Sequence, residues 1–167
     1  MKALTKVGLA ATVLVTTVLA TNIPLASAAP AVLGGVYTIQ QKSTGRHVDA
    51  HESSLDFSLV TRTPQLNDTQ RWILTSLGKN TYTIQQKSTG RYVDAHESSH
   101  DFSLVTRTPQ LNNTQRWILT PLGKNTYTIQ QKSTGRYVDA HESSHDFSLV
   151  TRPRQSNDTQ RWIINPL

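Results

Sequence analysis

Apolar and polar residues alternate in short runs over most of the chain, and the runs return with a period of 45 residues. In the middle copy, the alternation puts Tyr82 and Ile84 on one face of a predicted strand, because successive side chains of a strand point to opposite faces. Three further strand-like runs follow before the pattern starts again. The four strands predicted for this copy cover residues 81–85, 91–95, 102–106 and 114–119.

Turn residues separate these runs. The sequence Lys-Ser-Thr-Gly that ends at Gly90 is typical of a hairpin turn in which the glycine takes a positive φ angle. In the strand that follows, the alternation predicts that Val93 and Ala95 point inward and that Tyr92 and Asp94 point outward.

The period divides the chain into three tiles, at residues 33–77, 78–122 and 123–167. The first and second tiles agree at 37 of 45 positions, and the second and third at 39 of 45. Self-similarity at a fixed period is the signature of a repeat architecture. The chain is therefore expected to build its folded part from three copies of one four-stranded unit.

The terminal tiles indicate how the copies pack. An open array needs polar terminal repeats to cover its ends, whereas here the first and last tiles keep the same Ile, Val, Leu and Trp positions as the middle one. We therefore expect a closed array, which for three four-stranded units is an all-β fold, the β-trefoil, with pseudo-three-fold symmetry. A propeller-like assembly is the alternative, although propellers usually have four to eight blades and this chain would have to dimerise.

The tile resembles the repeat of the ricin B-type lectins. The shared residues of the middle tile are Tyr82-x-Ile84, Ser88-x-Gly90, Val93-Asp94-Ala95 and Gln115-x-Trp117. The resemblance covers residues 33–167 and occurs three times. It implies a β-trefoil in which the tryptophans pack in the core and the glutamines hold the fold by hydrogen bonds. These structural residues are Trp72, Trp117, Trp162, Gln70, Gln115 and Gln160.

The same resemblance implies a shallow sugar pocket in each repeat, without a cofactor or a metal. An Asp accepts hydrogen bonds from two sugar hydroxyls, a polar residue ahead of Gln-x-Trp adds a further bond, and an aromatic ring stacks on the sugar. The Asp position corresponds to Asp49, Asp94 and Asp139. The polar position falls on Asn67, Asn112 and Asn157, or on the Thr beside each Gln.

The aromatic position departs from the family pattern, because it falls on Val105 or Arg107. The outward residue beside the Asp is the substitute that we expect to stack on a sugar, and it is His47, Tyr92 or Tyr137 in the three tiles. A charged glycan met by Arg91 and Arg107 is a second possibility. The alternative for the Asp is a turn role, in which its carboxylate caps backbone N–H groups and binds no ligand. The nearby histidines are candidate ligand contacts or solvated loop residues, and they are His51, His96 and His141.

A zinc-peptidase motif also occurs, as His-Glu-Ser-Ser-His at residues 96–100 and 141–145. In metallopeptidases the two histidines lie one helical turn apart. Here the segment is a short polar bridge between two strands, its serines favour local turns, and the first tile has Leu55 in place of the second His. We therefore expect no metal site and no enzymatic activity.

The N-terminus has the layout of a secretory signal peptide. A basic head with Lys2 and Lys6 precedes an apolar run and an Ala-Ser-Ala end at Ala28, and the run is shorter than a membrane span needs. The alternative is an uncleaved anchor. We expect residues 1–28 to be removed, 29–32 to form a short lead and 33–167 to form the domain.

Composition limits the possible partners. The formal charge of +6 falls to +4 without the two lysines of the signal peptide, and the basic residues are scattered. This distribution is not typical of nucleic-acid binding. No cysteine is present, so the stability of the exported protein depends on its core.

Together these observations predict a secreted, monomeric, non-catalytic lectin that binds a glycan or polysaccharide, such as one on a cell surface, through up to three equivalent sites. The alternative is a β-trefoil module that binds protein, as an inhibitor or a toxin-targeting partner. The sequence does not identify the sugar.

Overall fold

A computed structural model describes residues 34–52, 57–65, 67–97, 102–142 and 147–167. These parts contain twelve strands and three short 3-10 helices. In chain order they are β1 (Gly35–Gln41), β2 (His47–Ala50), β3 (Leu59–Arg62), η1 (Asp68–Gln70), β4 (Trp72–Gly78), β5 (Thr81–Gln86), β6 (Tyr92–Ala95), β7 (Leu104–Arg107), η2 (Asn113–Gln115), β8 (Trp117–Gly123), β9 (Thr126–Gln131), β10 (Tyr137–Ala140), β11 (Leu149–Arg152), η3 (Asp158–Gln160) and β12 (Trp162–Pro166).

Six strands close into a barrel. Strand β1 pairs antiparallel with β12 and β4, β5 pairs with β4 and β8, and β9 pairs with β8 and β12. The first strand thus pairs with the last, with Ile39 opposite Ile164. Closure leaves no open end of the array to be capped, which agrees with the unmodified apolar positions of the terminal tiles.

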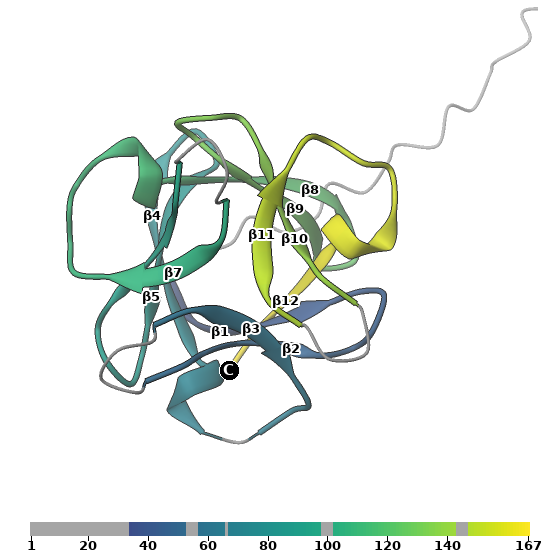
Figure 1. Cartoon of the computed structure of the whole chain (residues 1–167), viewed down its shortest axis with the longest axis horizontal. Coiled ribbons are helices and arrows are strands. Elements are labelled where there is room, and N and C mark those ends of the chain that lie inside the picture. Colours follow the sequence, from purple (N-terminus) through teal and green to yellow (C-terminus); the bar gives the residue numbers. More distant parts are fainter. Residues whose placement is uncertain (1–33, 53–56, 66, 98–101, 143–146) are drawn as a thin grey trace, which may run out of the picture.

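The remaining strands form three hairpins, β2–β3, β6–β7 and β10–β11, one from each tile. Isolated bridges join the outer strands of these hairpins to one another, at Ser58–Val105, Ser103–Val150 and Val60–Ser148. Figure 1 shows the three similar lobes around a common centre, with β3, β7 and β11 facing it. The arrangement is a β-trefoil of three four-stranded repeats, and not a propeller.

Side-chain contacts between consecutive tiles also complete a ring. A serine of one tile donates a hydrogen bond to a glutamate of the tile before it, in the pairs Ser88–Glu52 and Ser133–Glu97. The last tile closes on the first in the same way, because Ser43 donates to Glu142. Each tile therefore contacts both of the others.

The core lies inside the barrel and under the hairpins. Trp72, Trp117 and Trp162 are fully buried, and each indole N–H donates to a backbone carbonyl at 3.1 Å. A buried indole removes a large apolar area from water and has one N–H to satisfy. These tryptophans therefore supply the largest side chains of the core, as the family resemblance implied.

Two local expectations are corrected. Asp94 does not point outward but is fully buried, although Tyr92 beside it is half-exposed. The fourth strand of the middle tile begins at Trp117, and the residues before it form the 3-10 helix Asn113–Gln115. The turn prediction is confirmed, since Gly90 has a φ of 71°. Within the described part of the chain, no helix is long and apolar enough to cross a membrane.

Candidate functional site

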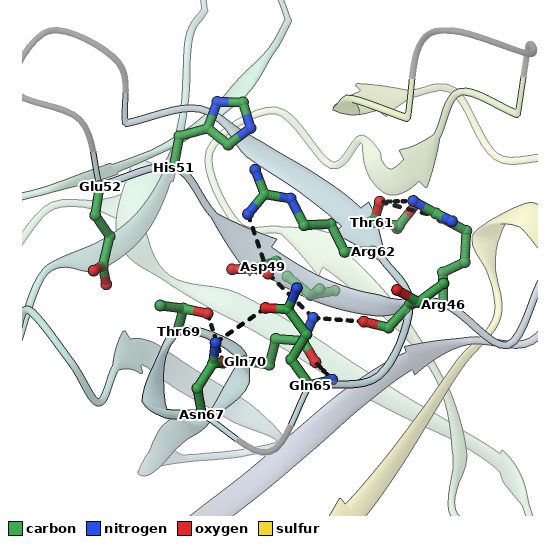
Figure 2. A network of polar contacts seen from close by, with 12 residues as sticks. Arg46, Asp49, His51, Glu52, Thr61, Arg62, Gln65, Asn67, Thr69 and Gln70 are labelled. Carbon is green, nitrogen blue, oxygen red and sulfur yellow. Dashed lines mark hydrogen bonds and ion pairs between the residues drawn. The ribbon is translucent and has the colours of Figure 1, made fainter.

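Each repeat buries an aspartate at the same place, on the second strand of the tile. In the first repeat, Asp49 Oδ2 accepts a hydrogen bond from Gln70 Nε2 at 3.1 Å and forms an ion pair with Arg62 Nη1 at 3.5 Å. The Asp side chain is fully buried, whereas the Arg62 side chain is 40% exposed. Figure 2 shows the guanidinium of Arg62 between Asp49 and His51.

The other repeats reproduce this arrangement. Asp94 accepts from Gln115 at 3.2 Å and pairs with Arg107 at 3.7 Å. Asp139 accepts from Gln160 at 3.1 Å, and its ion pair with an arginine of β11 is also 3.7 Å long. The similar distances make the buried aspartate a property of the tile.

The second carboxylate oxygen, Oδ1, is buried and has no hydrogen-bond partner among the described residues, in Asp49, Asp94 and Asp139 alike. In the view of Figure 2, this oxygen of Asp49 is turned away from Arg62 and Gln70, to the side on which Glu52 and Thr69 lie. The proposed turn role required backbone N–H donors to the Asp. No described backbone N–H hydrogen-bonds to Oδ1, so at this oxygen that role is not observed.

The glutamine of Gln-x-Trp holds the aspartate and the loop behind it. Gln70 Oε1 accepts from the backbone N–H of Gln65 at 2.7 Å, and its Nε2 donates to the carbonyl of Thr63 at 3.0 Å as well as to Asp49. Trp72 Nε1 donates to the carbonyl of Val48, the residue before the aspartate. The motif therefore fixes both the backbone and the carboxylate of the site.

A shallow depression of about 410 Å³ lies at the end of β2, next to Ala50, and the fully buried Asp49 is not itself part of its lining. Its lining consists of Ala50, His51, Glu52, Arg62 and Thr69. Thr69 precedes Gln70, so the polar residue that borders the depression is the Thr beside the Gln. Of the two residues expected at this polar position, Asn67 and Thr69, the lining favours the threonine.

Asn67 stands behind Thr69 and is exposed. Its Oδ1 accepts from Thr69 Oγ1 at 2.8 Å, and its Nδ2 donates to Gln65 Oε1 at 3.0 Å. Asn112 and Asn157 repeat these contacts. The asparagines thus orient the threonines, and Asn67 is not among the residues that line the depression next to Ala50.

The outward aromatic residue belongs to a different surface. Tyr92 lines a depression of about 240 Å³ with Leu77, Pro109, Leu111 and Asn112 among its neighbours, and Asp94 is not part of that lining. Tyr137 is half-buried. His47 is also half-buried, its Nδ1 has no partner among the described residues, and burial lowers its pKa. The structure therefore does not join Tyr92 to the aspartate in one pocket.

Two sets of arginines have different roles. Arg91 donates from Nε and Nη2 to the carbonyl of Thr106 and lies over the Phe57 ring at 3.7 Å. It thereby ties the second tile to the first. Arg107 pairs with Asp94. The sequence predicted Arg107 as a contact for a charged glycan, whereas the structure pairs it with the aspartate. The alternation in β7 could have indicated this pair. Val105 lies opposite Asp94, and Arg107 is two residues further along the strand on the same face.

His51 borders the depression, and the other two histidines occupy the same position in their repeats. His51 Nδ1 lies 3.3 Å from Ser58 Oγ, and His96 Nδ1 lies 3.5 Å from Ser103 Oγ. His141 is half-buried at the same position. The second histidines of the His-Glu-x-x-His segments lie outside the described residues. Over the ranges that the structure describes, no three His, Cys, Asp or Glu residues are grouped as a metal site requires.

The chain belongs to the family of ricin-type β-trefoil lectin-like domains, which matches residues 29–106 and 113–167. No curated protein sequence matches the chain. Membership of this lectin-like family supports carbohydrate binding as its general activity.

Solved structures share the fold at low sequence identity. ThreeFoil, a designed three-fold symmetric protein, has a TM-score of 0.72 and 20% identity over 80% of this chain and 99% of its own. The ricin B-like lectin of Macrolepiota procera in complex with lactose has a TM-score of 0.68 and 18% identity over 80% of this chain and 96% of its own. The exo-β-1,3-galactanase 1,3Gal43A of Clostridium thermocellum has a TM-score of 0.71 and 21% identity over 80% of this chain, which corresponds to 30% of the enzyme.

Proposed function

We propose that this protein is a secreted, non-catalytic lectin that binds glycans at three equivalent sites, one beside each buried aspartate. The general activity follows from the family, and the sites are argued from the geometry. The observation that carries the proposal is the free oxygen Oδ1 of Asp49, Asp94 and Asp139, buried in the same way three times.

A buried acceptor without a partner costs about 1–3 kcal/mol, and more when it is charged. Most buried polar atoms in folded proteins are hydrogen-bonded for this reason. A ligand that brings an O–H donor to Oδ1 removes this cost. Sugar hydroxyls are such donors, and Thr69 and the exposed guanidinium of Arg62 border the depression in the first repeat for further bonds.

Arg62 pairs with the other oxygen of the same carboxylate, Oδ2, and borders the depression. Its ion pair with Asp49 is 3.5 Å long, beyond the usual range of a charge-assisted hydrogen bond, and its side chain is 40% exposed. The arginine end of this pair is partly solvated, whereas the carboxylate end is fully buried. The guanidinium therefore stays as the counter-ion of the buried carboxylate, and its solvated N–H groups can bind a sugar hydroxyl.

Three copies give the sites a combined effect. A single exposed sugar site is weak, because the ligand exchanges bonds with water for bonds with protein. Three sites on one rigid ring raise avidity by roughly 10²–10⁴ when a dense glycan surface allows simultaneous contact. Cleavage near Ala29 is part of the proposal and is tested by mass spectrometry of the exported product.

The test is a glycan array with the mature protein and with the triple variant Asp49→Asn, Asp94→Asn and Asp139→Asn. Asparagine keeps the shape and one carbonyl acceptor, but it replaces a carboxylate oxygen with a donor. We expect the bound glycans to be lost while thermal unfolding shows a folded protein. Unchanged binding by the folded variant would refute the site.

A second candidate, a protein-binding module, is favoured by one asymmetric feature. Only the middle repeat combines Tyr92, Pro109 and Leu111. The first repeat has His47 in place of the tyrosine, and the third has Arg154 and Ser156 in place of the last two residues. Leu111 is 83% exposed and borders the apolar depression of about 240 Å³. If a protein ligand binds there, Leu111→Ser abolishes its binding and leaves the glycan array unchanged. The reverse result would eliminate this candidate.

A further inference from the structure

Arg62 also borders a second depression. This depression has a volume of about 380 Å³ and lies at the boundary between the first and third repeats. Its lining is Arg46, His51, Ser58, Val60, Thr61, Arg62, Phe147 and Ser148. His51 and Arg62 also line the depression next to Ala50. The two depressions are therefore neighbours that share a wall.

Arg46 is held in place in this second depression. Its guanidinium lies 3.8 Å from the centre of the Phe147 ring, and its Nη2 donates to the carbonyl of Thr61 at 2.7 Å. Its Nε donates to Thr61 as well. The third nitrogen, Nη1, makes no hydrogen bond with any described residue. A planar guanidinium fixed on one side by a ring and a carbonyl offers its remaining N–H groups without further loss of side-chain freedom.

Charge complementarity defines what such a depression receives. Two arginines line it, and no acidic side chain does so among the described residues. Guanidinium groups bind planar or tetrahedral oxyanions with charge-assisted hydrogen bonds. We propose that each repeat boundary is a subsite for the anionic substituent, a carboxylate or a sulfate, of an acidic glycan. The inference rests on the proposed function. The sugar ring that carries this anionic group, or the sugar ring next to it, is the one whose hydroxyls reach Asp49.

The subsite recurs around the centre of the ring. Arg91 lies over Phe57 and Arg136 over Phe102, as Arg46 lies over Phe147. The partner arginines Arg107 and Arg152 stand on β7 and β11 as Arg62 stands on β3. Since these three strands meet at the centre of the molecule, the anionic subsites face one end of the trefoil. A polymer with regularly repeated acidic groups therefore fits this surface better than an isolated acidic sugar.

The first experiment compares matched ligands on the mature, unmodified protein. Oligogalacturonate is measured against the neutral galactose oligomer of the same linkage and length, and a sulfated galactan oligomer against its desulfated form. We expect the acidic member of at least one pair to bind on the order of tenfold more tightly at low salt, with the advantage falling as salt is raised. Which pair shows the advantage identifies carboxylate or sulfate.

The second experiment removes the charge shared by both depressions, with the triple variant Arg62→Gln, Arg107→Gln and Arg152→Gln. The control is Lys79→Gln, Lys132→Gln and Arg154→Gln, which lowers the net charge equally at exposed positions outside the depressions. We expect the acidic preference to disappear in the first variant and to persist in the control. If the first variant does not fold, the comparison of matched ligands on the unmodified protein still tests the inference.

Three results would overturn the inference. They are equal affinity for both members of each pair, equal loss of the preference in the control variant, and binding of polyglutamate as tight as binding of the acidic glycan, which would indicate a non-specific effect of the basic surface. Neutral glycan binding that remains in these cases would leave the proposed function standing. Failure of every glycan to bind would instead refute the proposed function.

Discussion

The amide of Gln115 supports the buried aspartate, and its replacement by a carboxyl is the sharpest test of the site. Gln115 Nε2 donates to Asp94 Oδ2 at 3.2 Å and to the carbonyl of Thr108 at 2.9 Å, while its Oε1 accepts from the backbone of Gln110 at 2.8 Å. The substitution Gln115→Glu keeps the shape but removes both donors. It also places two carboxyl groups within hydrogen-bonding distance inside the fold.

The magnitude follows from proton linkage. Two carboxylates in contact cannot both be ionised, so the folded pair holds one proton. Holding a proton at pH 7 on a group that has a pKa of about 4.3 in the unfolded chain costs ~3.7 kcal/mol. The missing second donor to Thr108 adds about 1 kcal/mol. Domains of ordinary stability, about 5–15 kcal/mol, survive this loss.

The sign of the pH dependence is fixed. The folded variant binds a proton that the unfolded chain releases near neutral pH, so its stability increases as the pH falls from 7 towards about 4.3, by roughly 1.4 kcal/mol per pH unit. Urea unfolding followed by tryptophan fluorescence, at several pH values and relative to the unmodified protein, measures this. Gln110→Glu is the control, because Gln110 is exposed and the added charge is the same. A destabilisation that does not change with pH, or none at all, would refute the reasoning.

Three further predictions concern differences within and between the tiles. Phe102→Leu removes the ring under Arg136, 3.8 Å away, and the lost cation–π contact should cost about 0.5–2 kcal/mol in urea unfolding; an unchanged midpoint would contradict it. Asn113→Asp gives Lys132 the carboxylate that the other repeats already have, and should raise the unfolding temperature at low salt but not at about 1 M salt. His47→Tyr introduces the residue of the other two tiles. Because burial lowers the pKa of His47, the native protein loses stability as the pH falls below the ordinary histidine range, and the variant should lose less between pH ~7 and ~5.

The sequence alone was sufficient for the architecture. The 45-residue period and the uncapped terminal tiles predicted closure, and β1 does pair with β12. Alternation predicted four strands in each tile, because a strand with one face in the core must place apolar residues at every second position. It failed at the fourth strand, where the residues before Trp117 form a 3-10 turn instead. The polar Thr-Gln pair there is compatible with either state, and only packing selects between them.

For the site, the tertiary structure decided more than the sequence could predict. The sequence, through its family resemblance, located Asp49, Asp94 and Asp139 but could not predict that they are buried, since alternation on a strand assigns an Asp to the solvent side. The burial of Asp49 depends on contacts with Gln70 and Arg62, which lie 21 and 13 residues further along the chain. It also depends on the hairpin that covers the barrel. The same is true of Arg46 and Phe147, which meet only because the last tile closes against the first.

Local periodicity depends only on neighbouring residues. The sequence by itself therefore determined the tile, the number of its copies and the strands within each copy. Which polar groups meet, which oxygen remains without a donor and which guanidinium faces a depression depend on contacts between distant segments. The tertiary structure alone decided these, because electrostatic and hydrogen-bond partners are set by distances of a few ångströms that no spacing along the chain specifies.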